Sequence, residues 1–340
     1  MISIGLFLLA LIVRLPYLGG YMTIDEVKWI EGAGQFTLGL SRGDLFATYW
    51  HFFPGITITW GEAAVLWGQY LTSDAPNLAA FVEAQLDDLP NLVGSMRLAP
   101  VLITVLVVVG TFWLARPLLG DGSALLGAGL LAIDPFFVGH SRIVNGDAAA
   151  AGLMMLSFLA FAGLWWQQSW RHAVLAGIMG GLAVLTKLPA PIIFAWLALL
   201  ALASAVADRR WRFWLTVLVI AGVVGAVTFV LLFPAMWVDP LETLRLIYVE
   251  AFNVGELGEG HDTFFLGHIS DDPGWLFYPV AIAYRLTIPV MVGLLALVIW
   301  PWFGWRKTTP LQQKTLLALV AYIFFSGWWP MPALKSWIAT

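Results

Sequence analysis

Two adjacent carboxylates, Asp25 and Glu26, stand in the motif TIDEVKW at residues 23–29. Neighbouring helix positions point about 100° apart, so these two side chains cannot share one helix face. One of them can face a cavity while the other orients a neighbour, and a partly desolvated carboxylate is a fair general base. The structural alternative is that Asp25 is the N-cap of a helix over residues 26–36.

A second group of charged side chains lies in DPFFVGHSRIVNGD, at residues 134–147, between two apolar runs. Charges at the edge of an apolar region are costly and are usually paired or functional. Arg142 can bind a phosphate or pair with an acid of the first loop. Asp147 either belongs to the same site or caps the helix that follows it.

Two further cations lie close to apolar segments. Lys187, in the turn LTKLP at residues 185–189, either snorkels to the membrane surface or holds a lipid phosphate as a point charge. Arg285 lies inside an apolar run, where a charge needs an anionic partner.

Aromatic and acidic side chains gather in GEGHDTFFLG (258–267) and DDPGWLFYP (271–279), which contain His261, Trp275 and Tyr278. Aromatic rings stack on the apolar faces of sugars, and carboxylates accept hydrogen bonds from sugar hydroxyls. This loop therefore suits carbohydrate. A belt of interfacial Trp and Tyr explains the rings without any ligand.

The composition identifies the kind of protein that positions these residues. Of 340 residues, 60% are hydrophobic and only 11% are charged, whereas soluble domains are about 25% charged. A soluble enzyme, a DNA-binding module and a disordered chain are therefore excluded. The absence of cysteine also excludes disulfides, thiolate metal sites and cysteine nucleophiles.

The apolar residues come in runs of roughly 17 to 25, the length that crosses a bilayer. The sequence thus predicts an all-α polytopic membrane protein with about nine transmembrane helices. The nine segments are 2–18, 97–116, 123–139, 148–167, 173–187, 190–207, 212–235, 278–303 and 314–331.

Lys and Arg concentrate in the short loops of one side, which predicts that side to be cytoplasmic. These residues are Arg116, Arg171, Arg209, Arg210, Arg212, Arg306, Lys307 and Lys314. We therefore expect a multi-pass plasma-membrane protein with two long extracytoplasmic loops, 19–96 and 236–277. Within the first loop, residues 48–71 form either an interfacial amphipathic helix or a short re-entrant segment. A G-x-x-x-G pair, Gly177 and Gly181, fits close helix packing.

The order of these motifs resembles a known family. The first apolar segment ends in R-L-P, and an outer D-E pair and a long aromatic loop follow. Next come S-R-x-x-x-x-D, L-T-K-x-P, H-x-T-F-F-x-G and D-P-G-W-x-F-Y-P. The set resembles the GT-C integral-membrane glycosyltransferases, specifically the protein O-mannosyltransferase and aminoarabinose transferase group (glycosyltransferase family 39). The resemblance covers nearly the whole chain and implies a single GT-C-like transmembrane domain over residues 1–340.

The resemblance implies transfer of a sugar from a polyprenyl-phosphate donor on the extracytoplasmic side, with inversion at the anomeric carbon. Asp25 would be the general base that deprotonates the acceptor hydroxyl, and Glu26 would shape its pocket. Arg142 and Asp147 match the family's second outer motif and would organise the site near the leaving phosphate and the acceptor.

Lys187 and Arg285 join Arg142 in the expected donor phosphate site. His261 matches the family's late outer-loop histidine loosely, and we expect it to bind substrate with Trp275 and Tyr278. The expected partners are the lipid-linked donor, an acceptor protein, lipid or glycan, and membrane lipids, with no nucleic acid, no cofactor and no obligatory metal.

Two alternatives remain. Family members usually continue for several more helices, so this chain is expected to lack the family's C-terminal part, and a truncated, non-catalytic homologue fits that departure. A transporter or flippase of lipid-linked sugars would use similar outer charges. An enzyme requires Asp25, Arg142 and Asp147 to converge on one outer cavity.

Overall fold

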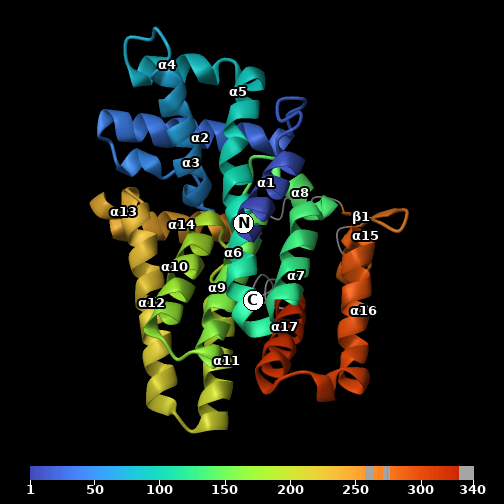
Figure 1. The fold of residues 1–340 in the computed structure, drawn as a ribbon. Coiled ribbons are helices and arrows are strands. Elements are labelled where there is room, and N and C mark those ends of the chain that lie inside the picture. The colour runs from blue at the N-terminus through green and yellow to red at the C-terminus, as the bar shows by residue number, and fades with distance from the viewer. Residues whose placement is uncertain (257–262, 271–273, 275, 329–340) are drawn as a thin grey trace. The chain divides into compact units, whose positions relative to one another are not determined.

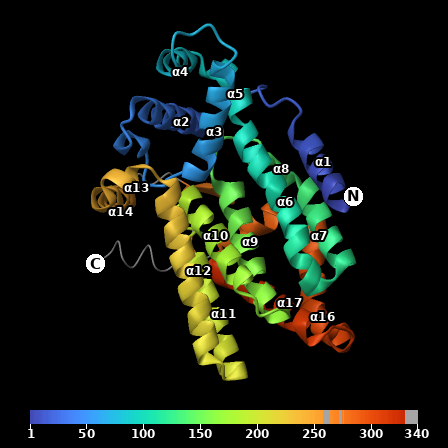
Figure 2. The same ribbon diagram turned by 60° about the vertical axis from the view of Figure 1, so that its left-hand side comes forward.

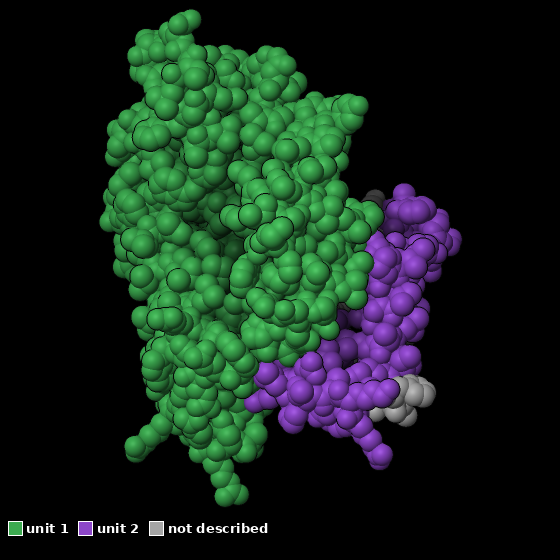
Figure 3. All heavy atoms as spheres, viewed as in Figure 1, with its two compact units in different colours: residues 1–247 green, residues 248–340 purple. Residues whose placement is uncertain are grey.

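The computed structural model describes residues 1–256, 263–270, 274 and 276–328. Within these ranges the chain is nearly all-α, with one two-stranded β-hairpin. The chain divides into two compact units, Met1–Ile247 and Tyr248–Thr340 (Figure 3). The expectation of a single domain over residues 1–340 stays a prediction.

The first unit contains the helices that carry most of the predicted site. They are α1 (Ile2–Arg14), α2 (Ile24–Arg42), η1 (Phe46–Thr48), α3 (Ile56–Tyr70), α4 (Leu78–Leu86), α5 (Leu89–Met96), α6 (Leu98–Leu119), α7 (Asp121–Ile133), α8 (Pro135–Ser141), α9 (Asp147–Trp166), α10 (Trp170–Thr186), α11 (Ile192–Asp208), α12 (Trp211–Leu232) and α13 (Ala235–Val238). Helix α14 (Pro240–Glu256) crosses the boundary between the units.

Within the described residues, the second unit contains a hairpin and four helical segments after α14. Strands β1 (Thr263–Phe265) and β2 (His268–Ser270) pair antiparallel, and α15 (Phe277–Arg285), α16 (Ile288–Phe303), η2 (Trp305–Lys307) and α17 (Pro310–Trp328) follow. The turn between the strands places Leu266 and Gly267 at positive φ, as a tight two-residue hairpin turn requires.

In the first unit, α2, α3 and α4 cluster at one end of the bundle formed by α9, α10 and α12 (Figures 1 and 2). An apolar core that includes Trp29, Ile58, Phe81 and Val93 joins the clustered helices to α5. The helix α3 lies within residues 48–71 and packs against α2, α6 and α10. The first predicted loop is therefore a helical assembly that rests on the ends of the bundle.

In the part of the chain that the structure describes, three helices are long and apolar enough to cross a membrane: Leu89–Leu119, Asp147–Trp166 and Trp211–Leu232. The pair Asp121–Ile133 and Pro135–Ser141, bent by 58°, is a fourth if it counts as one span. Shorter apolar helices lie at Ile2–Arg14, Trp170–Thr186, Ile192–Asp208 and Ile288–Trp300. The chain thus carries the apolar helices of a multi-pass membrane protein, and the number of nine spans stays a prediction.

The segment predicted over 123–139 breaks at Asp134. Pro135 has no backbone N–H and cannot continue α7, so it starts α8 as a new helix. Asp134 becomes the N-cap of α8, because its Oδ1 accepts from the backbone N–H of Phe137 at 2.9 Å.

The segment predicted over 278–303 breaks too, which corrects the depth expected for Arg285. Pro289 lies in the first turn of α16 and could not donate the helical hydrogen bond to Arg285. The backbone at Leu286 and Thr287 is extended. Arg285 is therefore the exposed last residue of α15 and does not lie inside a continuous apolar helix.

Gly177 and Gly181 on α10 allow the close approach of α12. A Cβ added to Gly177 would lie 2.6 Å from the carbonyl oxygen of Ala221, and one added to Gly181 would lie 2.7 Å from that of Gly225. These atoms belong to the α12 backbone, which cannot move as a flexible side chain does. The small-residue pair therefore sets the spacing between the two helices.

Gly177→Ala should destabilise the α10–α12 pair by ~1–3 kcal/mol, the usual cost of overpacking. Thermal unfolding in detergent measures this as a lowered Tm. The matched control is Gly129→Ala on α7, where an added Cβ meets nothing within 4 Å and where alanine favours a helix. Equal Tm values for the two variants would contradict the close packing.

Candidate active site

A buried ion pair joins Glu26 on α2 to Arg97, the residue between α5 and α6. Both side chains are about 1% exposed. Arg97 Nε donates to Glu26 Oε1 at 2.7 Å, and Arg97 Nη2 donates to Glu26 Oε2 at 2.6 Å. This bidentate geometry is the strongest arrangement of a guanidinium with a carboxylate.

The remaining hydrogen-bonding capacity of the pair holds two other segments of the chain. Glu26 Oε1 accepts from the backbone N–H of Val144 at 2.8 Å, which fixes the α8–α9 connection. Arg97 also donates to the carbonyl oxygens of Leu18 and Tyr21, between α1 and α2. One pair thus ties α2 to the end of the first apolar helix, to the start of α6 and to the second predicted motif.

Electrostatics keep Glu26 ionised. Burial alone would raise its pKa, but hydrogen bonds from Arg97, Thr23 and Val144 and the Arg97 charge outweigh burial and hold the pKa of Glu26 below its usual 4.5. Its two oxygens already accept every donor of this network. Glu26 is therefore suited to positioning its neighbours and not to taking a proton from a substrate.

Asp25, unlike Glu26, lies outside this buried network. Its side chain is exposed in the first turn of α2, and within the described residues it makes no hydrogen bond or ion pair. The alternative that Asp25 is the N-cap is wrong, because Thr23 occupies that position. Glu26 accepts from the Thr23 backbone N–H at 2.8 Å and from its hydroxyl at 3.0 Å, as the N3 carboxylate of a capping box does. Asp25 is left as an accessible carboxylate.

Trp29, one turn after Asp25, connects α2 to the second motif. A Cβ added to Gly146 would lie 3.2 Å from Trp29 Cη2 and 3.0 Å from the carbonyl oxygen of Thr186. Glycine at 146 allows the indole ring and the end of α10 to approach this backbone closely. Phe53 stacks on the other part of Trp29, with ring centroids 5.2 Å apart.

Asp147 and Lys187 form an ion pair beside this contact. Asp147 is the first residue of α9 and Gly146 is the N-cap, so the alternative that Asp147 itself caps the helix is wrong. Lys187 is the C-cap of α10, and its side chain is 29% exposed. Two residues that are distant in the sequence and were both predicted for the site thus lie together.

Arg142 lies half-buried just after α8. Its Nη2 donates to the carbonyl oxygen of Pro16, while its buried Nε has no hydrogen-bond partner in the described part of the chain. The guanidinium is therefore held at the α1–α2 connection, and its buried Nε–H is unsatisfied within the described residues.

The remaining four predicted residues belong to the range of the second unit. Arg285 ends α15 and is exposed. Tyr278 is the second residue of α15. His261 and Trp275 lie outside the described residues. Whether these four residues join the site of the first unit stays a prediction.

An apolar cavity of about 630 Å³ is lined by residues from both sides of Lys187 in the sequence. Val184 on α10 and Pro191 before α11 are both in its wall, on either side of the lysine in the sequence. The rest of the wall comes from α10 to α14: Gly181, Phe194, Leu197, Ala198, Leu218, Ala221, Gly222, Gly225, Ala226, Phe229, Val230, Met236 and Leu244. An apolar chain with an anionic end fits a cavity of this kind.

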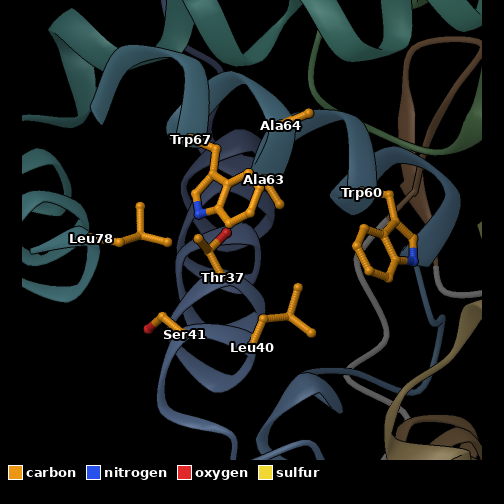
Figure 4. A pocket seen from close by; sticks show the side chains of 8 residues that line it. All are labelled: Thr37, Leu40, Ser41, Trp60, Ala63, Ala64, Trp67 and Leu78. Carbon is orange, nitrogen blue, oxygen red and sulfur yellow. The ribbon is translucent and has the colours of Figure 1, made fainter. Parts of the chain in front are cut away.

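A smaller apolar cavity of about 210 Å³ lies between α2 and α3 (Figure 4). Thr37, Leu40 and Ser41 of α2 line it together with Trp60, Ala63, Ala64 and Trp67 of α3 and Leu78 of α4. None of the predicted site residues is in its wall.

Sequence reasoning missed two charged residues of the α2–α3 assembly. Arg97 was taken only as the start of an apolar segment, although a cation at that boundary needs a partner as much as Arg285 does. Glu62 on α3 is fully buried, and neither of its oxygens has a hydrogen-bond partner among the described residues. Burial, followed by the nearby Glu26 charge, raises the pKa of Glu62 well above its usual 4.5 and so favours the neutral carboxylic acid.

Within the described residues, no three His, Asp or Glu side chains gather closely enough to hold a metal ion. Residues 91–237 match the model of the dolichyl-phosphate-mannose-protein mannosyltransferase family. This range includes Arg97, Arg142, Asp147 and Lys187.

The match confirms the resemblance to GT-C membrane glycosyltransferases. It spans somewhat less than half of the chain, from α5 to α13, and leaves Asp25 and Glu26 outside. No curated protein matches the sequence. Together with the apolar helices, the match indicates a multi-pass membrane glycosyltransferase of mannosyltransferase type.

Glu26→Gln should destabilise the protein by ~3–5 kcal/mol, because it leaves the buried Arg97 charge without its partner. The control is Glu83→Gln, which breaks an exposed ion pair with Arg42 and should cost at most about 1 kcal/mol. Denaturant or thermal unfolding measures both. If the two variants unfold alike, the buried pair does not hold the assembly together.

Glu62→Gln should remove a pH dependence of stability. Because the pKa of Glu62 is raised in the folded state, the unfolded chain releases a proton above about pH 4.5 that the folded chain retains. Stability contributed at this position is therefore lost as the pH rises. The Tm of Glu62→Gln relative to the wild type should therefore increase as the pH rises above about 4.5. A constant difference would refute the raised pKa of Glu62.

Proposed function

We propose that this protein is an inverting glycosyltransferase that moves a sugar from a polyprenyl-phosphate donor to an acceptor hydroxyl on the extracytoplasmic side of the membrane. The observation that carries the proposal is the meeting of three motifs around Trp29. These are the first turn of α2 with Asp25, the connection that ends in Asp147, and the α10–α11 turn with Lys187. The family match supplies the reaction class.

Asp25 acts as the general base in this proposal. It takes the proton of the acceptor hydroxyl while the hydroxyl oxygen attacks the anomeric carbon from the face opposite the phosphate. The bond between the anomeric carbon and the phosphate oxygen breaks, and the polyprenyl phosphate leaves with the bonding electron pair. The transition state has oxocarbenium character, as in glycoside hydrolysis. The exposure of Asp25 and its lack of a partner in the described chain support this role.

Arg142 and Lys187 stabilise the charge of the departing phosphate. The unused Nε donor of Arg142 supports its part. Lys187 is paired with Asp147 in the free protein, so the phosphate would share or take over this ammonium, and Asp147 would then be free to orient the acceptor. Arg285, His261, Trp275 and Tyr278 are proposed to complete the site as phosphate and sugar contacts.

The polyprenyl chain of the donor is proposed to lie in the apolar cavity between α10, α11 and α12. The cavity has the volume of a small-molecule site, its wall is apolar, and two residues of the wall, Val184 and Pro191, flank Lys187 in the sequence. An anionic head at Lys187 and an isoprenoid tail in the cavity would bind as one ligand. The acceptor is a protein, a lipid or a glycan.

Asp25→Asn should lower kcat for sugar transfer by ~10²–10⁴, the usual contribution of a general base. Folding should not change, because the exposed side chain contacts no partner in the described chain. Transfer from a radiolabelled polyprenyl-phosphate sugar in membranes measures the rate, at matched protein levels. Glu31→Gln, an exposed acid of the same helix, is the control and should keep wild-type activity. Retained activity in Asp25→Asn would remove Asp25 as the base.

Gly222→Leu should fill part of the apolar cavity and raise KM for a long-chain donor roughly tenfold, since each displaced methylene is worth about 0.8 kcal/mol. A geranyl-phosphate analogue, whose tail is short, should be affected much less. Gly127→Leu is the matched control, because an added Cβ meets nothing within 4 Å at either glycine and Gly127 lies outside the cavity wall. Equal effects on both donors would mean that the tail binds elsewhere.

A further inference from the structure

Four cations belong to the segments that meet at the candidate site, and three of them are already engaged. Arg97 donates to Glu26, Arg142 to the Pro16 carbonyl oxygen and Lys187 to Asp147. The fourth, Lys28 on α2, makes no hydrogen bond or ion pair with any residue that the structure describes. It is exposed, and its partner among the described groups is an aromatic ring.

The position of Lys28 relates it to the proposed base. It follows Asp25 by three residues on α2, a spacing that places two side chains on neighbouring parts of one helix face. No ion pair joins the two. An exposed carboxylate and an exposed ammonium, neither of them ion-paired within the described residues, therefore stand within one turn of α2.

The surroundings of Lys28 lead directly to the paired residues of the site. The Lys28 ammonium lies 6.0 Å from the centroid of the Phe53 ring, within cation–π range. Phe53 stacks on Trp29, and the far edge of that indole meets Gly146, the residue before Asp147. A continuous aromatic wall thus runs from Lys28 to the Asp147–Lys187 pair.

The positive charge of Lys28 also acts on the buried side chain of His51. Burial, followed by the Lys28 charge, lowers the pKa of His51 to about 4. His51 packs on Phe53, with ring centroids 3.7 Å apart. At neutral pH this imidazole is uncharged, so Lys28 is the positive charge at this end of the wall.

We propose that Lys28 binds the phosphate of the lipid-linked donor, opposite Lys187 across the aromatic wall of Trp29 and Phe53. This inference rests on the proposed function. An ammonium ion is a mobile point charge with three donors and suits a phosphate whose charge changes during transfer. Lys28 is free to receive the phosphate before the Asp147–Lys187 pair opens, and it holds the phosphate group one turn from the base.

The test compares Lys28→Gln, Lys28→Arg and the wild-type full chain in lipid nanodiscs. Binding of undecaprenyl phosphate, which carries no sugar, is measured by a thermal shift, and inorganic phosphate serves as the tail-free probe. Sugar transfer gives KM and kcat separately. Arg42→Gln, which removes one positive charge from the far end of the same helix, is the matched control.

Lys28→Gln should weaken undecaprenyl phosphate binding and raise KM about tenfold, the loss expected for one charge-assisted hydrogen bond. Lys28→Arg should restore both, and Arg42→Gln should resemble the wild type. The kcat should change less than KM. Stronger weakening for the lipid phosphate than for inorganic phosphate would identify the lipid as the source of the phosphate.

Two other outcomes overturn different statements. If the wild type binds the lipid phosphate and transfers sugar, and Lys28→Gln does both equally well, the role of Lys28 is refuted while the proposed function stands. If the wild type neither binds undecaprenyl phosphate nor transfers sugar, the proposed function fails first, and the inference fails with it.

Discussion

The pair of Glu26 and Arg97 determines where the reactive residues can be. It is fully buried, and burying two charges is favourable only when geometry and additional hydrogen bonds compensate the loss of water. Here the compensation comes from the backbone of two separate connections, at Leu18 and Tyr21 in the first and at Val144 in the second. Satisfying the pair therefore forces the α1–α2 connection, the start of α6 and the α8–α9 connection into one place.

Glu26 and Asp25 have different surroundings because neighbouring positions of a helix point to different sides. Glu26 faces inward and fixes the frame, whereas Asp25 faces outward with its oxygens unoccupied. Trp29 follows one turn later and approaches Gly146 closely. Asp147, the next residue, forms an ion pair with Lys187. The proposed base and the two proposed site residues Asp147 and Lys187 thus belong to the segments that meet around Trp29 in the first unit.

The sequence predicted the helical class and the apolar character of the helices that the structure shows, and it singled out Asp147 and Lys187, which the structure brings together. Residue types were sufficient there, because charges at the ends of apolar runs are rare and need a reason. Local breaks were harder to predict. Pro135 and Pro289 divide two predicted segments, since a missing N–H outweighs hydrophobic continuity, and the second break moves Arg285 to a helix end.

The contacts that assemble the site could not be predicted from local pattern. Arg97 and Glu26 are far apart in the sequence, and neither local motif indicates that the other residue is its partner. Lys187 and Asp147 were each predicted for the site, yet their pairing depends on how α9 packs along α10. Glu62 looks like an ordinary polar residue of an amphipathic helix, and only the packing of α3 shows it to be buried. Tertiary structure decides partners, while sequence indicates which residues need one.

The stereochemistry of transfer tests the central claim most directly. Purified protein in nanodiscs would receive a polyprenyl-phosphate sugar of known anomeric configuration together with a simple hydroxyl acceptor, and NMR would assign the anomer of the product. A base on one face and a leaving phosphate on the other predict a single product of inverted configuration. A product of retained configuration, or no transfer from any lipid-linked donor, would contradict the account.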